Sequence, residues 1–429
     1  MIAPRAQHTP LERVRVLQRK LYLAAKGAPQ RTFGVLYDKV CRAEVLRVAW
    51  IQVRRNHGAA GPDGQTIAAI EAHGVDQFLA DIREELVAHR YRPMAVRRVY
   101  IPKRRGGQRP LGIPRIKDRI VQAAVRLVIE PLFEASFRPG SYGFRPKRGA
   151  REAIADIRKW VTYGYDQVID LDLKDYFGSL DHRLLMQLVQ RRVRDPWVLR
   201  LIRRWLKAGV LVDGQIEATR IGTPQGGVIS PLLANVYLHP LDKHWEVTMG
   251  GRTQMIRYAD DVVVLCRRQR PEAVYAHLTA FLTRLHLTVN PDKTRLVQAQ
   301  DGFDFVGVHF RLLPTRRDPR RRFCYAWPSQ RAMSQVRDRV RDAIGRNTVH
   351  SLEEQIAKLN PILRGWGSYF GWLNAHRHFR KVDEYVSGKL RKFLWKKHQR
   401  VGRRLRSAST SHFERLGLYH LHGTIAHAS

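Results

Sequence analysis

The sequence predicts an α+β fold in which a mixed region of strands and helices is followed by a region of helices alone. Two observations support this prediction. Apolar, β-branched runs at 168–173, 255–265 and 303–310 have the composition of strands, and they alternate with segments of helical periodicity. Between residues 329 and 398 the apolar residues recur at helical spacing. A chain of 429 residues is long enough for two or three domains with their own cores.

The composition favours a nucleic-acid partner. The net charge is +39, yet 44% of the residues are hydrophobic, which indicates a globular protein rather than a disordered basic tail. An anionic membrane surface is the alternative partner for so basic a protein. Residues 1–15 lack the apolar core of a signal peptide, and no apolar run approaches the ~20 residues that span a bilayer. We therefore expect a cytoplasmic protein with no membrane partner. Three widely separated cysteines argue against disulfides and against a cysteine-paired zinc site.

Helices and one loop are predicted before the first strands. Apolar spacing indicates helices over 11–25, 36–54 and 77–89, and the glycine-rich segment 56–64 is a loop. A hairpin follows, with strands 96–102 and 109–114 around Gly106-Gly107. Its cations, among them Lys103 and Arg109, suit a triphosphate or a template backbone. A solvated basic hairpin is the alternative for each of them.

Three aspartates form the candidate catalytic centre. Asp260 and Asp261 lie between two apolar runs and are expected at the tip of a hairpin, while Asp172 ends the predicted strand 168–173. Carboxylates on neighbouring strands can hold two Mg²⁺ ions roughly 3.5–4 Å apart, the arrangement used for nucleotidyl transfer. The alternative is an ordinary hairpin turn, because aspartate favours turns.

Two further side chains have a possible role at the same centre. Phe177 comes five residues after Asp172, so its ring could exclude a ribose 2′-hydroxyl and select deoxynucleotides; the alternative is a core aromatic residue. Lys293 follows a predicted helix over 271–286 and could donate a proton to the leaving pyrophosphate. Its alternative is an ordinary loop lysine.

Two glycine-containing loops could approach a nucleic acid. In the segment 222–231 the Gln225 amide could contact a nucleotide, and Gly226 and Gly227 would let a base pair come near the backbone. In the segment 141–146 the aromatic residues and Arg145 suit stacking and phosphate contact. A structural turn explains the second loop equally well.

The C-terminal region predicts a basic helical bundle. Helices are expected over 329–346, from Ser351 to a break at Asn360-Pro361, over 362–374 and over 376–398. Their basic faces could grip a duplex through its phosphates. A plain helical bundle with a solvated face is the alternative. The candidate contacts are Arg337, Arg341, Lys392, Lys396 and Lys397.

The ordered set of these motifs resembles that of the reverse transcriptases carried by bacterial group II introns, the reverse transcriptase/maturases. The matching blocks are 96–114, 141–146, 168–182, 222–238, 254–266, 287–296 and 303–308. The segment 56–64 is similar to the family's extra N-terminal motif, and the segment 363–370 resembles its maturase domain.

The resemblance implies a right-hand polymerase with fingers and palm, the palm sheet being antiparallel, and an all-helical thumb/maturase domain. The expected divisions are an N-terminal extension over 1–95, fingers and palm over 96–315, thumb/maturase over 316–400 and a short basic segment over 401–429. The last could be a remnant of a DNA-binding segment. We expect no counterpart of the family's HNH endonuclease, so that the primer would come from elsewhere.

The resemblance also assigns roles and partners. It makes Asp172, Asp260 and Asp261 the catalytic carboxylates that hold two Mg²⁺ ions. It makes Lys103, Arg109, Phe177, Gln225 and Lys293 the contacts of the incoming dNTP. The implied partners are a group II intron RNA, an RNA template, a DNA primer or target, and dNTPs; the oligomeric state stays open.

The implied function is RNA-directed DNA synthesis by target-primed reverse transcription, together with binding of the intron RNA to assist splicing and mobility. Two alternatives remain at this point. One is a domesticated reverse transcriptase in defence or repair that has no intron partner. The other is a maturase that acts only as an RNA chaperone, without catalysis.

Overall fold

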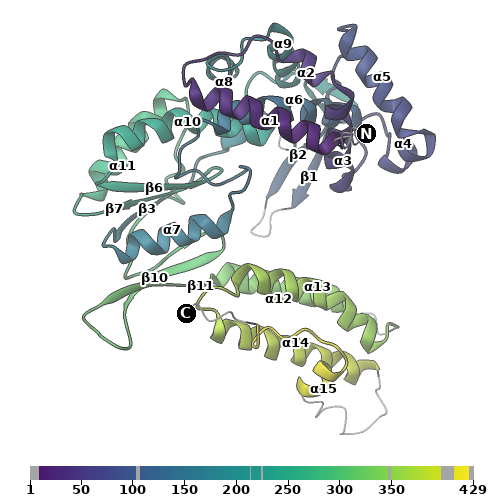
Figure 1. The fold of residues 1–429 in the computed structure, drawn as a ribbon. Helices are drawn as coiled ribbons and strands as arrows, with labels where there is room; N and C mark the ends of the chain where they lie inside the picture. Colours follow the sequence, from purple (N-terminus) through teal and green to yellow (C-terminus); the bar gives the residue numbers. More distant parts are fainter. Residues whose placement is uncertain are drawn as a thin grey trace, which may run out of the picture.

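The computed structural model describes residues 9–102, 107–212, 214–223, 226–345, 349–397 and 410–424. Figure 1 shows helices at the N-terminal end, sheets in the middle and a group of long helices at the C-terminal end. The predictions made for Lys103 and Gln225 fall outside the described residues.

The N-terminal helices pack around one long buried helix. α1 begins with a capping box, in which Thr9 and Glu12 exchange side-chain and backbone hydrogen bonds. The central helix is α6 (Ile116–Glu134), which is buried on almost every face and joins α1 and α3 in the larger hydrophobic core. The five helices are α1 (Pro10–Gly27), α2 (Tyr37–Val40), α3 (Ala43–Arg55), α4 (Ile67–His73) and α5 (Val75–Val87).

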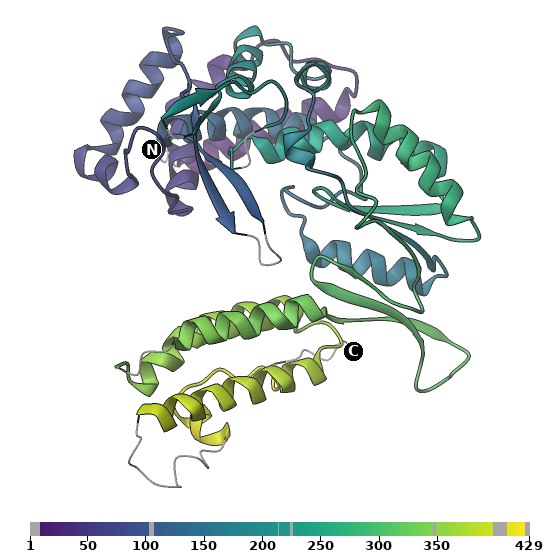
Figure 2. The ribbon, with the colours of Figure 1, turned by 180° about the vertical axis from the view of Figure 1, so that it is seen from behind.

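A small sheet projects from these helices and corresponds to the predicted fingers hairpin. Its strand order is β2-β1-β4-β5, with β1 antiparallel to β2 and parallel to β4. The strands are β1 (Val96–Pro102), β2 (Gln108–Ile113), β4 (Val210–Val212) and β5 (Gln215–Glu217). The hairpin of β1 and β2 points toward the C-terminal helices (Figures 1 and 2).

The central sheet is antiparallel and has the order β6-β7-β3-β8. Its strands are β3 (Gln167–Leu171), β6 (Thr253–Tyr258), β7 (Asp261–Cys266) and β8 (Arg295–Gln298). Alternate residues of each strand enter two different cores. Leu171 and Val262 face the larger core with α10 and α11, whereas Val168 and Val263 face the second core with α7. The surrounding helices are α7 (Ala150–Thr162), η1 (Tyr176–Gly178), α8 (His182–Gln190), α9 (Pro196–Leu206), α10 (Ser230–Met249) and α11 (Pro271–Arg284).

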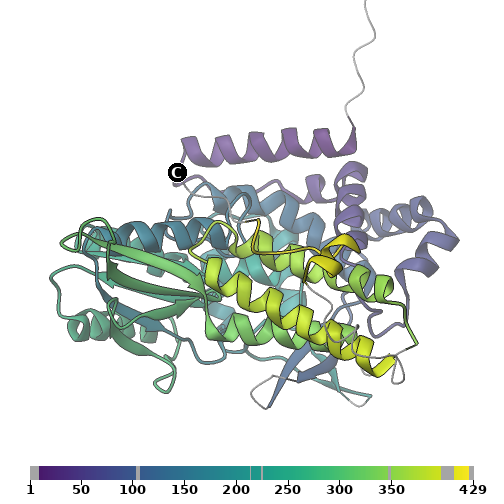
Figure 3. The same cartoon turned by 90° about the horizontal axis from the view of Figure 1, so that it is seen from below.

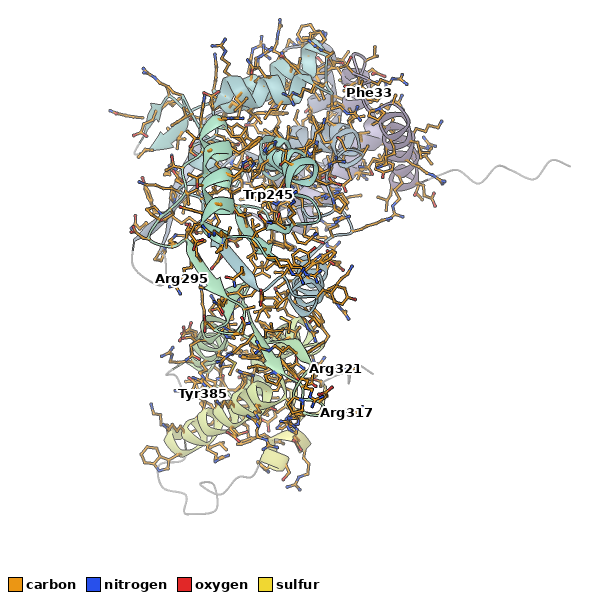
Figure 4. The ribbon with its side chains drawn as sticks, turned by 90° about the vertical axis from the view of Figure 1, so that its left-hand side faces the viewer. Phe33, Trp245, Arg295, Arg317, Arg321 and Tyr385 are labelled. Carbon is orange, nitrogen blue, oxygen red and sulfur yellow. The ribbon has the colours of Figure 1, made fainter. Side chains whose placement is uncertain are left out.

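A third sheet connects the central sheet to the C-terminal helices. It has the order β11-β10-β9, from β9 (Phe303–Phe305), β10 (Val308–Pro314) and β11 (Arg322–Pro328). The predicted basic connection is the loop of this β10–β11 hairpin, where Arg317 and Arg321 lie (Figure 4). Strand β11 was not predicted from the sequence. The long helices that follow are α12 (Gln330–Ile344), α13 (Leu352–Phe370) and α14 (His376–Lys397).

Helix α13 corrects one prediction. The break expected at Asn360-Pro361 does not occur, and the helix runs through Pro361 without interruption. A proline removes one helical hydrogen bond, but Leu359 and Leu363 on either side are fully buried in the bundle core and hold the helix there. Tertiary packing therefore outweighs the local preference.

The C-terminal segment differs from the expected basic appendage in the part that is described. Residues 401–409 and 425–429 lie outside the described residues, and α15 (Thr410–Arg415) begins a segment that folds back on α13 and α14. Phe413 and Leu421 are fully buried in the second core, and the backbone amides of Leu421 and His422 donate to the Asp383 carboxylate at 3.0 and 2.9 Å. Residues 410–424 thus complete the bundle core, and a DNA-binding role for the C-terminal segment stays a prediction.

The parts together form a right-hand arrangement of fingers, palm and a helical C-terminal part. α12 and α13 face the β1–β2 hairpin, and the central sheet lies at one end between them (Figures 1 and 2). α14 lies on the side of α12 and α13 away from the hairpin, nearest the viewer in Figure 3. None of the helices in the described ranges combines the length and apolar character needed to cross a bilayer.

Candidate active site

The predicted carboxylate hairpin is confirmed by the strand pairing. Tyr258 pairs with Asp261 across β6 and β7, so Ala259 and Asp260 form a two-residue turn. Ala259 has a φ of 60°, as expected for a tight hairpin of this length. Asp260 therefore lies in the turn itself, and Asp261 is the first residue of β7.

The register of the central sheet brings the third carboxylate beside this turn. Leu171 of β3 pairs with Val262 of β7, so the next position along each strand sets Asp172 opposite Asp261. Directly opposed residues of an antiparallel pair project to the same face, with Cβ atoms about 4.5–5.5 Å apart. The side chains of Asp172 and Asp261 therefore project from the same face of the sheet.

The electrostatics of the three carboxylates fit a bound cation. Burial, with the negative charges of Asp260 and Asp172, raises the pKa of Asp261 to about 6. Burial also raises the pKa of Asp260, with a further contribution from Asp172, while Arg109 opposes the shift. Within the described ranges no three His, Cys, Asp or Glu side chains are gathered closely enough to form a ready-made metal cage. Mg²⁺ suits such an open carboxylate site, because it is usually bound by one or two carboxylates together with water and substrate phosphates.

Lys293 lies at this centre and contacts a carboxylate. Its Nζ is 3.2 Å from Asp172 Oδ2, which also accepts from Asn290 Nδ2 at 3.2 Å. The backbone N–H of Asn290 donates to the Asp172 carbonyl at 2.8 Å, and Thr294 Oγ1 accepts from the Asp172 N–H at 3.3 Å. Asn290 was not singled out from the sequence, although the Asn-Pro dipeptide marked its turn. Together these contacts fix Asp172 from the loop after α11.

Phe177 is mostly a core residue in this structure. Its side chain belongs to the larger hydrophobic core and the residue is 8% exposed, and its ring packs edge-on against Tyr176 at a centroid distance of 5.5 Å. The Phe177 carbonyl accepts from the Thr223 N–H at 2.8 Å, which joins η1 to the glycine-rich loop. Phe177 is therefore a core residue, as the alternative stated. Its role in selecting the sugar stays a prediction.

The glycine-rich loop touches the fingers. Gly226 has a φ of 110°, and a Cβ added there would lie 2.8 Å from the carbonyl oxygen of Gly112 on β2. Glycine is thus needed at position 226 because a side chain there would collide with the backbone of β2. Gly227, the next residue, is buried. Any contact of Gly226 or Gly227 with nucleic acid stays a prediction.

Arg145 does not have the role predicted for it. Its guanidinium is buried, forms an ion pair with Glu134 at 2.5 Å and donates to the carbonyls of Arg138 and Ser141 at 2.6 and 2.7 Å. These partners occupy the donors that a phosphate would need. Arg145 therefore organises the loop 138–145, and stacking of a nucleic acid on the loop's aromatic residues stays a prediction.

The candidate thumb contacts have different environments. Arg337 lies over the ring of Tyr385 at 5.8 Å, and Arg341 pairs with Asp338 on its own helix. Lys397 donates to the His350 carbonyl at 2.6 Å and so joins α14 to the start of α13. Tyr385 is labelled on the C-terminal helices in Figure 4. Lys392 and Lys396 are exposed, on the helix that lies away from the fingers.

Sequence reasoning missed three charged residues of the site, which are Arg331, Asp170 and Arg257. Arg331 of α12 lowers the pKa of Asp261, so it lies near the carboxylates. Asp170 precedes Asp172 by two residues on the same face of β3, and its pKa is raised to about 7, first by burial and then by Asp261. Arg295 on the adjacent β8, labelled in Figure 4, is its cross-strand neighbour. The third is Arg257, whose position directly before the Tyr258 to Asp261 segment was the only available signal.

Arg257 anchors the carboxylate hairpin from inside the protein. It is fully buried and pairs with Asp242 of α10 through two hydrogen bonds of 2.9 and 2.6 Å. It also donates to Asn235 Oδ1 and to the Ala259 carbonyl, both at 2.9 Å, and to Ser141 Oγ at 2.7 Å. One side chain thus connects α10, the loop 138–145 and the turn that carries Asp260.

A palm sheet with carboxylates on two adjoining strands, faced by a basic hairpin, defines a nucleotidyl-transferring polymerase of the right-hand class. Comparison with known proteins agrees. Residues 101–310 match the family model for reverse transcriptase (RNA-dependent DNA polymerase), and residues 333–410 match the maturase-specific domain of group II introns. The chain belongs to the reverse transcriptase/maturases of the group II intron type.

Two individual relatives are consistent with this assignment. Protein YkfC of Escherichia coli K12 is 34% identical over 330 residues, which are 68% of this chain and 86% of YkfC. The group II intron-encoded protein LtrA of Lactococcus lactis subsp. cremoris is 38% identical over 214 residues, 49% of this chain but only 35% of LtrA. A telomerase structure from Candida albicans covers 76% of this chain and 65% of its own at 11% identity and a TM-score of 0.40, which is a loose likeness.

Proposed function

We propose that this protein extends the 3′-hydroxyl of a DNA primer with deoxynucleotides on an RNA template, using two Mg²⁺ ions held by Asp172, Asp260 and Asp261. The observation that carries the proposal is the register that sets Asp172 opposite Asp261, beside Asp260. When bound, such ions lower the pKa of the attacking hydroxyl and neutralise charge on the leaving pyrophosphate.

The protein's own residues supply the remaining parts. Arg109 of the fingers lowers the pKa of Asp260, and we assign its guanidinium to the triphosphate of the incoming nucleotide. Lys293 holds Asp172 in place before the substrate arrives, and its ammonium is a source of a proton for the leaving pyrophosphate. Arg331 adds a positive charge from the maturase side of the site.

Primer extension tests this function. A DNA primer annealed to an RNA template is incubated with dNTPs and Mg²⁺, with the wild-type protein and with Asp260→Asn. The substitution keeps the shape of the turn but removes one negative charge, so extension should fall by at least about 10²-fold, in line with the loss of a major electrostatic contribution. The control is Asp301→Asn, an exposed aspartate in the turn after β8, which should extend normally. Equal activity in all three proteins would reject the assignment.

We also propose that the protein binds a group II intron RNA and assists its splicing. The match of residues 333–410 to the maturase-specific domain favours this second function. Because it needs no nucleotidyl transfer, Asp260→Asn should bind and splice the RNA as the wild type does at low Mg²⁺. If the same substitution abolished splicing assistance in a folded protein, the two functions would not be separable as proposed.

A further inference from the structure

A group of arginines lies at the end of the central sheet opposite the carboxylate hairpin. Strand β7 begins at Asp261 and ends at Cys266, and a rise of about 3.3 Å per residue separates the two by about 17 Å. Arg267 and Arg268 follow β7 directly, and Arg252 precedes β6 at the same end. The N–H of Arg267 donates to the Arg252 carbonyl at 3.2 Å, so these two residues are neighbours.

The positive charge at this end is not balanced within the described part of the protein. Four arginines there are exposed, namely Arg252, Arg267, Arg268 and Arg270. None of the four forms an ion pair with a described residue. The neighbouring carboxylates are Asp166, which accepts from Gln300 at 3.3 Å, and the exposed Glu272. Like charges gathered in this way repel one another, and a bound polyanion would relieve the repulsion.

The end of α7 brings aromatic side chains to the same place. Arg267 lies 6.0 Å from the ring centroid of Tyr165, and its Nε is 3.7 Å from the point where a Cβ on Gly164 would lie. Tyr165 packs edge-on against Trp160 at a centroid distance of 5.4 Å, and Trp160 packs edge-on against Tyr163 at 6.3 Å. Tyr163 is 59% exposed, so an aromatic ring stands open to solvent beside the arginines.

The local fold does not account for the exposed ring. The N–H of Tyr163 donates to the carbonyls of Lys159 and Trp160 at 3.0 and 3.1 Å, which any residue other than proline could do. Its hydroxyl has no hydrogen bond to a described residue. Tyr165 differs, because it is buried and its hydroxyl donates to the Gly251 carbonyl at 2.9 Å. Tyr165 therefore holds the turn before β6, whereas the side chain of Tyr163 is available to a ligand.

The basic loop of the β10–β11 hairpin lies at the same end of α7. The N–H of Cys324, near the start of β11, donates to Thr162 Oγ1 in the last turn of α7 at 3.1 Å. Arg317 and Arg321, labelled in Figure 4, belong to the loop that precedes β11. The positive surface thus continues from the end of β7 past α7 to this loop.

We propose that this end of the palm is a nucleic-acid-binding surface separate from the polymerase centre, and that it holds a single-stranded segment of the bound RNA. A base stacks on Tyr163, and the phosphates beside it contact the arginines. Stacking on an aromatic ring suits any base, and the planar guanidinium matches phosphate oxygens. A single strand fits better than a duplex, because only an unpaired base can offer its face to the ring. The inference rests on the proposed RNA-binding function and adds a surface outside the maturase-matching residues 333–410.

The first test measures stacking while the polymerase centre is occupied. The protein is saturated with a blunt RNA–DNA hybrid, and a fluorescent oligoadenylate of about 12 nucleotides is then titrated by anisotropy. Tyr163→Ala should weaken binding of the oligoadenylate about tenfold, the value of one stacked base, and Tyr163→Trp should bind as tightly as the wild type. Wild-type affinity in Tyr163→Ala, or an equal loss in Tyr163→Trp, would overturn the proposal.

The second test addresses the phosphate contacts in the same assay. Arg252→Gln with Arg268→Gln should reduce the log–log salt slope by about 1.4, because each phosphate contact of a single strand contributes about 0.7. The matched control is Arg183→Gln with Arg203→Gln, which removes two exposed arginines of α8 and α9 and should leave the slope unchanged. Equal slopes in the two double variants would mean that only net charge matters, and the proposal would fail.

Crosslinking on the wild-type protein locates the strand without any substitution. An oligonucleotide of the same length that contains 4-thiouridine, irradiated in the complex, should label a peptide that contains Tyr163. Labelling confined to other peptides would refute this inference alone, whereas a wild-type protein that binds no RNA would refute the proposed RNA-binding function as well. Primer extension on a short template should be unchanged in Tyr163→Ala, because Tyr163 lies beyond the far end of β7 from Asp261.

Discussion

Arg257→Lys should weaken both the fold and the catalytic turn, although it keeps the charge. The guanidinium makes five hydrogen bonds inside the protein, and only a planar fork can serve Asp242, Asn235 and the Ala259 carbonyl at once. Lysine can satisfy about half of them. With a net contribution of about 0.5–1.5 kcal/mol for each hydrogen bond, the loss of two or three bonds should lower the unfolding free energy by about 1–4 kcal/mol.

Removing the charge altogether should cost more. Arg257→Met leaves Asp242 buried at 4% exposure without its cation, and breaking such a pair costs about 3–5 kcal/mol. The double variant Arg257→Met with Asp242→Leu removes the uncompensated charge as well, so it should regain part of the stability. Activity should not return, because the Ala259 carbonyl still lacks its donor.

Urea unfolding followed by tryptophan fluorescence measures the stabilities, and primer extension under conditions where every variant is folded measures the activity. Arg252→Lys is the matched control, since this exposed arginine precedes the same strand and should stay within about 0.5 kcal/mol of the wild type. If Arg257→Lys were as stable and as active as the wild type, the network around Arg257 would not be what fixes the turn.

Three further results are expected. The pKa of Asp170 is raised from 3.8 to about 7, so its ionisation opposes folding; Asp170→Asn should leave stability unchanged near pH 4, raise it as the pH increases, and level off above pH 7, with at most about 4 kcal/mol gained in urea titrations with EDTA. Phe413→Ala should cost about 3–5 kcal/mol in the same titrations, because Phe413 is fully buried in the second core; a loss below 1 kcal/mol would show that residues 410–424 are a loose tail. Replacing Lys392 and Lys396 by Gln should reduce the log–log salt slope of intron RNA binding by about 1–2, and an unchanged slope would remove them from the interface.

The sequence was sufficient for the features that local pattern determines. The apolar runs and the turn chemistry around Asp260 predicted the hairpin, and the order of motifs predicted the family. The environment of single polar residues could not be predicted in the same way. Arg145 and Arg257 are both arginines beside conspicuous motifs, yet their partners Glu134 and Asp242 belong to other elements, 11 and 15 residues earlier in the chain.

The helical region shows the same limit. Pro361 predicts a break by local chemistry, but the burial of its neighbours keeps α13 continuous. The role of residues 410–424 depends on contacts with α13 and α14 that no spacing within the segment reveals. The spacing of two residues places Asp170 and Asp172 on the same face of β3, but only the register of β3 and β7 shows that Asp261 shares that face.

The two faces of the central sheet have a practical consequence for separating the two functions. The strands that carry the carboxylates lie between the two hydrophobic cores. The larger core, on one face, includes residues of the N-terminal helices. The second core, on the other face, includes residues of α12, α13 and α14. Cutting the chain after β11 would expose to water the part of the second core that α12, α13 and α14 cover. Because the polymerase and maturase parts share this core, we expect that neither part is stable without the other. Point substitutions, rather than shortened chains, are therefore the way to study each activity alone.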